Sequence, residues 1–152
     1  MPLTTVGAQK TIKIRQKPTP ALKSKKGVMP ANLANKRITK IIKFWLPVLL
    51  IMGFIFYASS LPAKDIPPLF PSQDFAFHLI IYLALSYFFI RALKNTYTNI
   101  APAKAVLFTV IFASLYGLTD EFHQLFVVGR NASIFDLFID SIGSFIGALL
   151  YR

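Results

Sequence analysis

The side chains in this sequence best suited to chemistry are its two histidines and the acids that stand near them at helical spacing. They form three pairs, each three or four residues apart: Asp74 with His78, Asp120 with His123, and Asp136 with Asp140. Residues at these spacings share one face of an α-helix. An imidazole beside a carboxylate can move a proton, and grouped carboxylates can bind a polar ligand. The pattern therefore predicts either acid–base chemistry or recognition of a polar ligand.

The composition tells which elements must position these side chains. The chain of 152 residues is 55% hydrophobic, yet 17 Lys or Arg against 6 Asp or Glu give it a formal net charge of +11. The many Leu, Ile, Val and Phe residues exclude disorder over most of the length, and the absence of cysteine excludes a disulfide scaffold. We therefore expect an all-α membrane protein, a four-helix transmembrane bundle with a disordered basic N-terminal tail.

The basic tail comprises residues 1–43, which hold eleven basic residues and no acid. Its apolar residues show no helical or strand spacing, so ordering it would bury too little surface to offset the chain entropy. We predict a disordered cytoplasmic tail over 1–43 and a transmembrane domain over 44–152. The tail would set the topology or attract anionic lipid. Nucleic-acid binding is not expected, because the tail has no aromatic residue for base stacking.

Four apolar segments are expected to span the membrane: 44–61, 74–90, 105–126 and 133–152. The first is eighteen uncharged residues, which cover ~27 Å as a helix. Ser133, three residues before Asp136, has the spacing of a helix cap. The tail, the 91–104 loop and Arg152 hold fifteen of the seventeen basic residues and none of the acids. Basic loops stay in the cytoplasm, so we expect both termini there.

The polar residues of the four segments should lie at similar depths. Counting ~1.5 Å per residue from the basic residue at each cytoplasmic end puts them roughly 18 to 29 Å up, in the outer part of a hydrocarbon core about 30 Å thick. Ionisable groups at such depths are costly, so they normally face the bundle interior and pair with one another. We therefore predict one polar pocket. Its catalytic candidates are His78, Asp120, Glu121, His123 and Asp140, and its ligand-binding candidates are Ser59, Asp74, Tyr116, Gln124, Arg130 and Asp136.

Some of these residues have a structural explanation. Asp74 and Asp136 begin descending helices, where the helix dipole favours an anion. Asp120 and Glu121 lie near the C-terminal end of a helix, where the dipole disfavours negative charge. Those two need a cationic or hydrogen-bonding partner, for which Arg130 and the two histidines are available. Farther along, a Gly-x-x-x-Gly pair at 143 and 147 predicts close packing of the last helix on a neighbour.

At this point the residues resemble the signature of VanZ-like membrane proteins. The resemblance is carried by Tyr116-Gly117, Asp120-Glu121, His123-Gln124, Val128-Gly129-Arg130, Ser133, Asp136, Asp140 and Gly143. An upstream block also looks like the family's: Ser59-Ser60-Leu61-Pro62, Asp74, His78 and Tyr82. The resemblance covers roughly residues 44–152. Phe75, Leu79 and Val128 depart from the family's usual Lys, Phe and Pro.

The resemblance implies an integral protein of the bacterial inner membrane, associated with the cell envelope and with low-level resistance to the glycopeptide teicoplanin. The missing Lys removes one cation from the outer site, so the family's preference for substrate charge does not transfer directly. The expected partner is a membrane lipid or a lipid-linked envelope molecule.

Three functions stay open at this point. A binder or carrier would use the polar layer to recognise a lipid head group or an amphipathic antibiotic. Because four spans are few for two alternating gates, a transporter would require a homo-oligomer. An enzyme would use His123 or His78 as general acid or base, with Arg130 holding an anionic group. A purely structural network is the third reading. With no close pair of histidines and no cysteine, no metal and no cofactor is expected.

Overall fold

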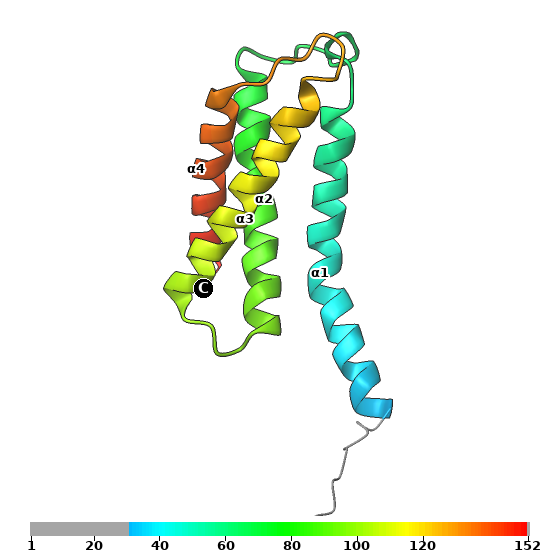
Figure 1. The fold of residues 1–152 in the computed structure, drawn as a ribbon, viewed down its shortest axis with the longest axis vertical. Coiled ribbons are helices and arrows are strands. Elements are labelled where there is room, and N and C mark those ends of the chain that lie inside the picture. The colour runs from blue at the N-terminus through cyan, green and yellow to red at the C-terminus, as the bar shows by residue number, and fades with distance from the viewer. Residues whose placement is uncertain (1–30, 152) are drawn as a thin grey trace, which may run out of the picture.

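The computed structural model describes residues 31–151 of the chain, and every regular element in this range is helical. In chain order the elements are α1 (Ala31–Ser59), the short 3-10 helix η1 (Ala63–Asp65), α2 (Gln73–Thr96), α3 (Pro102–Gln124) and α4 (Ile134–Leu150). The helices run alternately up and down, so α2 and α4 point the same way and α3 crosses them obliquely (Figure 1). The predicted all-α, four-helix architecture is confirmed. Three of the helices, α1, α2 and α3, are long and apolar enough to cross a membrane.

Helix α1 begins at Ala31, thirteen residues before the membrane span that we predict over 44–61. The tail that we expected to be disordered as far as residue 43 is therefore helical from Ala31 onward; residues 1–30 lie outside the described range. The physical reason is helix propagation: once the membrane span has formed, each added residue gains a hydrogen bond at little cost. No glycine or proline interrupts residues 31–43, and our expectation overlooked that Ile38, Ile41 and Ile42 recur at helical spacing.

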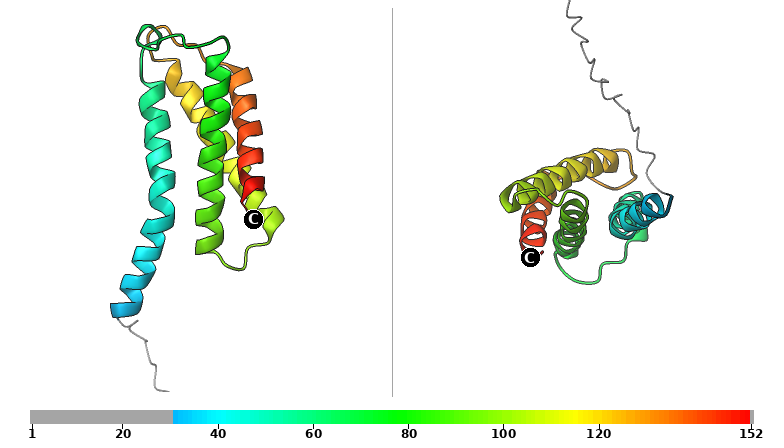
Figure 2. Two further views of the ribbon diagram at one scale, coloured as in Figure 1. Left: turned by 180° about the vertical axis from the view of Figure 1, so that it is seen from behind. Right: turned by 90° about the horizontal axis from the view of Figure 1, so that it is seen from below.

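Helices α2 and α4 are packed very closely, side by side in both views of Figure 2. A Cβ atom added at Gly143 would lie 2.5 Å from the carbonyl oxygen of Leu79, and one at Gly147 would overlap the carbonyl oxygen of Leu83. Only glycine lets the two backbones approach in this way. The close packing predicted from the glycine pair is confirmed, and the neighbour is α2.

The core of the bundle lies between α2 and its neighbours. Tyr82, Leu85 and Phe89 of α2 are buried against Val48 and Ile55 of α1. In contrast, the outward faces of the helices expose many large apolar side chains, as a surface in contact with lipid does.

The two ends of the bundle differ in chemistry. At the end where α2 finishes, Arg91 lies over the Phe44 ring and Lys94 over the Tyr151 ring, each 5.0 Å from the ring centroid. There the Trp45 Nε1–H also donates to Thr96 Oγ1 at 2.9 Å. Basic and aromatic side chains together mark a membrane interface. The opposite end carries the 60–72 and 125–133 connections (Figure 1), and Glu121, Asp136 and Asp140 lie in the helix turns next to the second of these.

Candidate functional site

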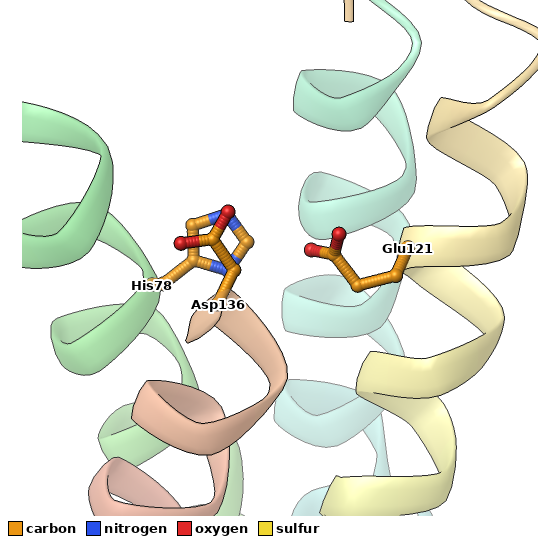
Figure 3. Close-up of side chains that lie close together, drawn as sticks. All are labelled: His78, Glu121 and Asp136. Atoms are coloured by element: carbon orange, nitrogen blue, oxygen red, sulfur yellow. The ribbon is translucent and has the colours of Figure 1, made fainter. Parts of the chain in front are cut away.

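Four of the expected site residues converge from three helices, near the end of the bundle that carries the two long connections. His78 comes from the second turn of α2, Glu121 from the last turn of α3, and Asp136 and Asp140 from the first two turns of α4. One side-chain nitrogen or oxygen from each of His78, Glu121 and Asp136 lies within 4.8 Å of the others. Figure 3 shows the Glu121 carboxylate pointing toward the other two side chains. We call His78, Glu121, Asp136 and Asp140 the acidic cluster.

The cluster is anchored by an ion-pair geometry between His78 and Asp140. The Nδ1 atom of His78 lies 2.9 Å from Oδ1 of Asp140, and the Asp140 side chain is fully buried. A carboxylate accepts a hydrogen bond from an imidazole N–H, so this contact fixes both the tautomer and the orientation of the ring. The ring also lies parallel to that of Tyr82, one helical turn away. His78 is thereby held with Nε2 as the nitrogen left for a ligand.

Several oxygen atoms of the cluster have no hydrogen-bond partner within residues 31–151. They are Glu121 Oε1, Asp136 Oδ1 and Asp140 Oδ2, and the hydroxyl of Tyr82, whose ring lies parallel to that of His78, also has no partner there. The other Glu121 oxygen, Oε2, accepts the backbone N–H of Ser133 at 2.7 Å. That hydrogen bond holds the carboxylate in place and leaves Oε1 free. Because buried polar atoms are normally paired, the unsatisfied oxygens indicate a site for hydrogen-bond donors or a cation.

An apolar pocket adjoins the cluster where the end of α3 meets the start of α4. Glu121 and Ser133 form its polar part, and the remaining lining is apolar: Leu118, Phe122, Leu125, Ala132, Ile134 and Leu137. The Ile134 side chain is 88% exposed, so the pocket faces outward from the bundle. The structure thus joins a polar site to an apolar surface.

A second set of predicted site residues contacts α1 instead of the cluster. The Tyr116 hydroxyl donates to the Met52 carbonyl oxygen at 2.7 Å. The His123 Nε2 atom lies 3.0 Å from Ser60 Oγ, and the ring stacks on Phe56. These contacts fasten α3 to α1, which makes His123 a weaker candidate for catalysis than His78.

Arg130 also contacts α1. Its guanidinium donates to the carbonyl oxygen of Ala58 at 3.2 Å and, through Nε, to that of Leu61 at 3.4 Å. Ala58 is in the last turn of α1, where its carbonyl oxygen also accepts the Leu61 N–H, and Leu61 follows the helix by two residues. A cation at this helix end interacts favourably with the helix dipole. We expected Arg130 to be available to Asp120 and Glu121. The structure gives those acids other partners, because Asp120 Oδ2 accepts from Gln124 Nε2 at 3.2 Å and Glu121 from the Ser133 amide.

Two further predicted residues stay apart from the cluster. Asp74 is exposed at the beginning of α2, one turn before His78. Ser59 is buried, but its hydroxyl donates to the Phe56 carbonyl oxygen within its own helix. Asp136, by contrast, has both a structural role and a place in the site. Its backbone N–H donates to the Ser133 cap, as predicted, and its side chain belongs to the cluster.

Two features of the site were not among the predicted site residues. Tyr82 is fully buried with its ring parallel to that of His78, and its spacing of four residues from His78 could have indicated it. The backbone amide of Ser133 has no sequence signal for contacting Glu121, twelve residues earlier.

Comparison with known proteins identifies the family. A family model described as VanZ/LLP1 matches residues 44–152. No curated protein and no solved structure gave a significant match. The matched segment contains the acidic cluster and almost all of the described helical bundle. With a family match over most of its length and three helices able to span a bilayer, this chain belongs to the VanZ/LLP1 family of membrane proteins.

Proposed function

We propose that this protein binds the polar head of an amphipathic or lipid-linked cell-envelope molecule. The observation that carries the proposal is the set of buried carboxylate oxygens without partners in the acidic cluster, contributed by α3 and α4. Such oxygens cost free energy when a site is empty and gain it when a donor arrives. The adjoining apolar pocket supplies a surface for the hydrocarbon part of the same ligand.

The charge of the site favours a particular kind of head group. Glu121, Asp136 and Asp140 are hydrogen-bond acceptors when ionised, and Arg130 is occupied by the end of α1. The cluster therefore suits amines, amides and sugar hydroxyls better than a bare phosphate. The amphipathic envelope glycolipids have such groups, and so does the glycopeptide teicoplanin that the family resemblance suggests. Teicoplanin enters the proposal as a candidate ligand of the acidic cluster, because it carries these donor groups.

The proposed site faces the outer leaflet of a bacterial inner membrane, with both chain termini in the cytoplasm. The support is the charge bias: Arg91 and Lys94 lie with Trp45 and Tyr151 at one end of the bundle, while the acidic cluster lies toward the other.

Reporter fusions test this orientation. Alkaline phosphatase fused after Ala63 is expected to be active and the same enzyme fused after Lys94 inactive, because the reporter folds only where disulfides form. Activity is measured in whole cells and normalised to the amount of fusion protein. The reverse pattern would place the acidic cluster on the cytoplasmic side and overturn the outer-leaflet proposal.

A second candidate function, a membrane-embedded enzyme, is favoured by the His78–Asp140 contact. A buried aspartate that fixes an imidazole leaves the opposite nitrogen in position to take or give a proton. In this reading His78 is the general base, Asp140 positions it, and the substrate is a lipid-linked envelope molecule. The geometry supports His78 for this role over His123, which contacts α1.

One experiment tests binding and separates it from catalysis. Purified protein in lipid nanodiscs is incubated with a labelled glycolipid or with labelled polyprenyl phosphate. We expect saturable binding of the glycolipid, weakened about tenfold or more in Glu121→Gln because a charge-assisted hydrogen bond is lost. Asp74→Asn, which changes an exposed carboxylate outside the cluster, is the matched control and should bind like the wild type.

The other outcomes are equally informative. A chemical product that forms with wild-type protein and not with His78→Gln would establish the enzyme. Absence of saturable binding to the glycolipid, or equal loss in Glu121→Gln and Asp74→Asn, would contradict the proposed binding site.

A further inference from the structure

We propose that His78, Glu121 and Asp136 form a binding site for one divalent transition-metal ion, with Asp140 as the residue that positions His78. The inference goes beyond the proposed function and uses the same free carboxylate oxygens of Glu121 and Asp136, but its test needs no lipid ligand because the ion is titrated alone. Three observations carry it: the separation of the ligand atoms, the buried free oxygens, and the contact behind the imidazole.

The separation of the three ligand atoms suits a single ion. They lie within 4.8 Å of one another, although their helices are separate in the sequence. Nitrogen and oxygen ligands about 2.0 to 2.2 Å from one tetrahedral ion lie roughly 3.3 to 3.6 Å apart. Side-chain shifts of about 1 Å therefore bring the three atoms onto one ion. The close-up in Figure 3 shows the three side chains turned toward a common space.

The carboxylates of Glu121 and Asp136 each have a buried oxygen available to bind an ion. The Glu121 side chain is 4% exposed, its Oε2 atom is held by the Ser133 amide, and its Oε1 atom has no partner among the described residues. Asp136 likewise has one buried oxygen, Oδ1, without a partner in that range. A buried acid with one fixed and one free oxygen is an observation that points to a ligand, beyond the clustering of acids itself.

The contact behind His78 matches the support that metal-bound histidines have. Its Nδ1 atom faces Asp140, which leaves Nε2 as the ligand nitrogen. A carboxylate on the far side of a metal-bound imidazole fixes its tautomer and raises its basicity. Asp140 is fully buried, so water cannot replace its carboxylate as the partner of the His78 Nδ1 atom.

Charge and ligand type select the class of ion. Two carboxylates balance the charge of a divalent cation, which matters at a depth where an uncompensated charge is costly. The imidazole ligand favours Zn²⁺ over Ca²⁺ and Mg²⁺, which prefer oxygen, and the two carboxylates also suit Mn²⁺. Three protein ligands also leave a coordination position for an oxygen atom of a ligand. With Nε2 on an ion, His78 is no longer available as a general base, so this site and the acid–base reading exclude each other.

Direct titration of the ion tests the site without any lipid ligand. The full chain is purified in detergent through an affinity tag that contains no histidine, stripped with chelator, and titrated calorimetrically with Zn²⁺ and with Mn²⁺. We expect one ion per chain with at least one of the two metals. Glu121→Gln and His78→Gln should weaken binding at least tenfold, and Asp140→Asn should weaken it about 10- to 100-fold. The chain offers matched controls: Asp74→Asn and His123→Gln should retain the wild-type affinity.

The outcomes separate this inference from the proposed function. No stoichiometric binding of either metal, or the same loss in Asp74→Asn as in Glu121→Gln, would overturn the metal site and leave glycolipid binding untouched. Each variant is also melted in the same detergent. If Glu121→Gln does not fold, Asp136→Asn takes its place, and its failure to weaken binding would likewise overturn the inference.

Discussion

Replacing Gly147 by leucine is expected to separate α4 from α2 and to destabilise the folded bundle strongly. Even a Cβ atom at this position would overlap the carbonyl oxygen of Leu83, which is backbone and cannot rotate away. Overpacking a tight contact costs typically 1 to 3 kcal/mol, and here the larger side chain adds to an obstructed Cβ. We expect a loss of about 3 kcal/mol or more and a lower melting temperature in detergent. Because α4 carries Asp136 and Asp140, ligand binding should fail as well.

The same substitution at Gly53 is the control. A Cβ atom added there meets nothing within 4 Å, so Gly53→Leu introduces the same side chain without a clash. It should melt at or above the wild-type temperature, because leucine favours a helix over glycine by a few tenths of a kcal/mol to about 1 kcal/mol. Equal melting temperatures for both variants would contradict the close α2–α4 packing.

Replacing Asp140 by leucine is expected to lower the affinity for the glycolipid about a hundredfold while the protein remains in the membrane. The substitution removes the partner of His78 Nδ1 and one acceptor of the acidic cluster. A charge-assisted hydrogen bond is worth about 1.5 to 3 kcal/mol, and each 1.4 kcal/mol is a tenfold change in affinity. Removing one partner of a buried pair also lowers the free energy of unfolding, by about 3 to 5 kcal/mol, because the imidazole of His78 loses its partner.

The conservative variant Asp140→Asn sharpens this prediction. Its amide oxygen can still accept from His78, so it should recover part of the affinity that the leucine variant loses. Affinity is measured on purified protein, and the amount in the membrane by quantitative immunoblot. If Asp140→Leu disappears from the membrane, Asp140 is part of a network that holds the helices together, and its role in ligand recognition fails.

Much of the fold could be predicted because its signals are local. The Ser133 cap, the apolar segments and the glycine pair of α4 each depend on residues within a few positions of one another. The start of α1 could not be placed in this way. Its first thirteen residues are helical because the span behind them has already formed a nucleus, and a search for a self-sufficient amphipathic pattern overlooks such a segment.

The sequence predicted the height of the site residues along their helices, but not the side of the helix to which each side chain points. Distance from a basic helix end gives the height of a side chain, and His78, Glu121, Asp136 and Asp140 do share one layer. The side toward which a residue points depends on how the helices are rotated, which packing decides. His123 follows Glu121 by two residues, about 200° around the helix, and therefore faces α1.

The metal ligands and the role of Arg130 could not be read from the chain for related reasons. His78, Glu121 and Asp136 come from three separate helices, so no ligand-spacing motif joins them. Arg130 lies in a connection whose path is set by contacts such as Ala63 N–H with the Val128 carbonyl oxygen. The sequence gives the charge of Arg130, but it does not indicate that this side chain contacts the end of α1.

Helix α4 is short, and its length bears on the thickness of the bilayer beside it. Its seventeen residues rise about 26 Å, several ångströms less than a hydrocarbon layer of about 30 Å. Its C-terminal end is level with the basic end of α2, because Lys94 lies over the Tyr151 ring and Asn95 bonds the Tyr151 hydroxyl. The shortfall therefore falls at the other end, next to Asp136. A helix too short for its bilayer thins the bilayer locally, so we expect hydrophobic mismatch beside α4 to bring water and lipid head groups to the level of the acids.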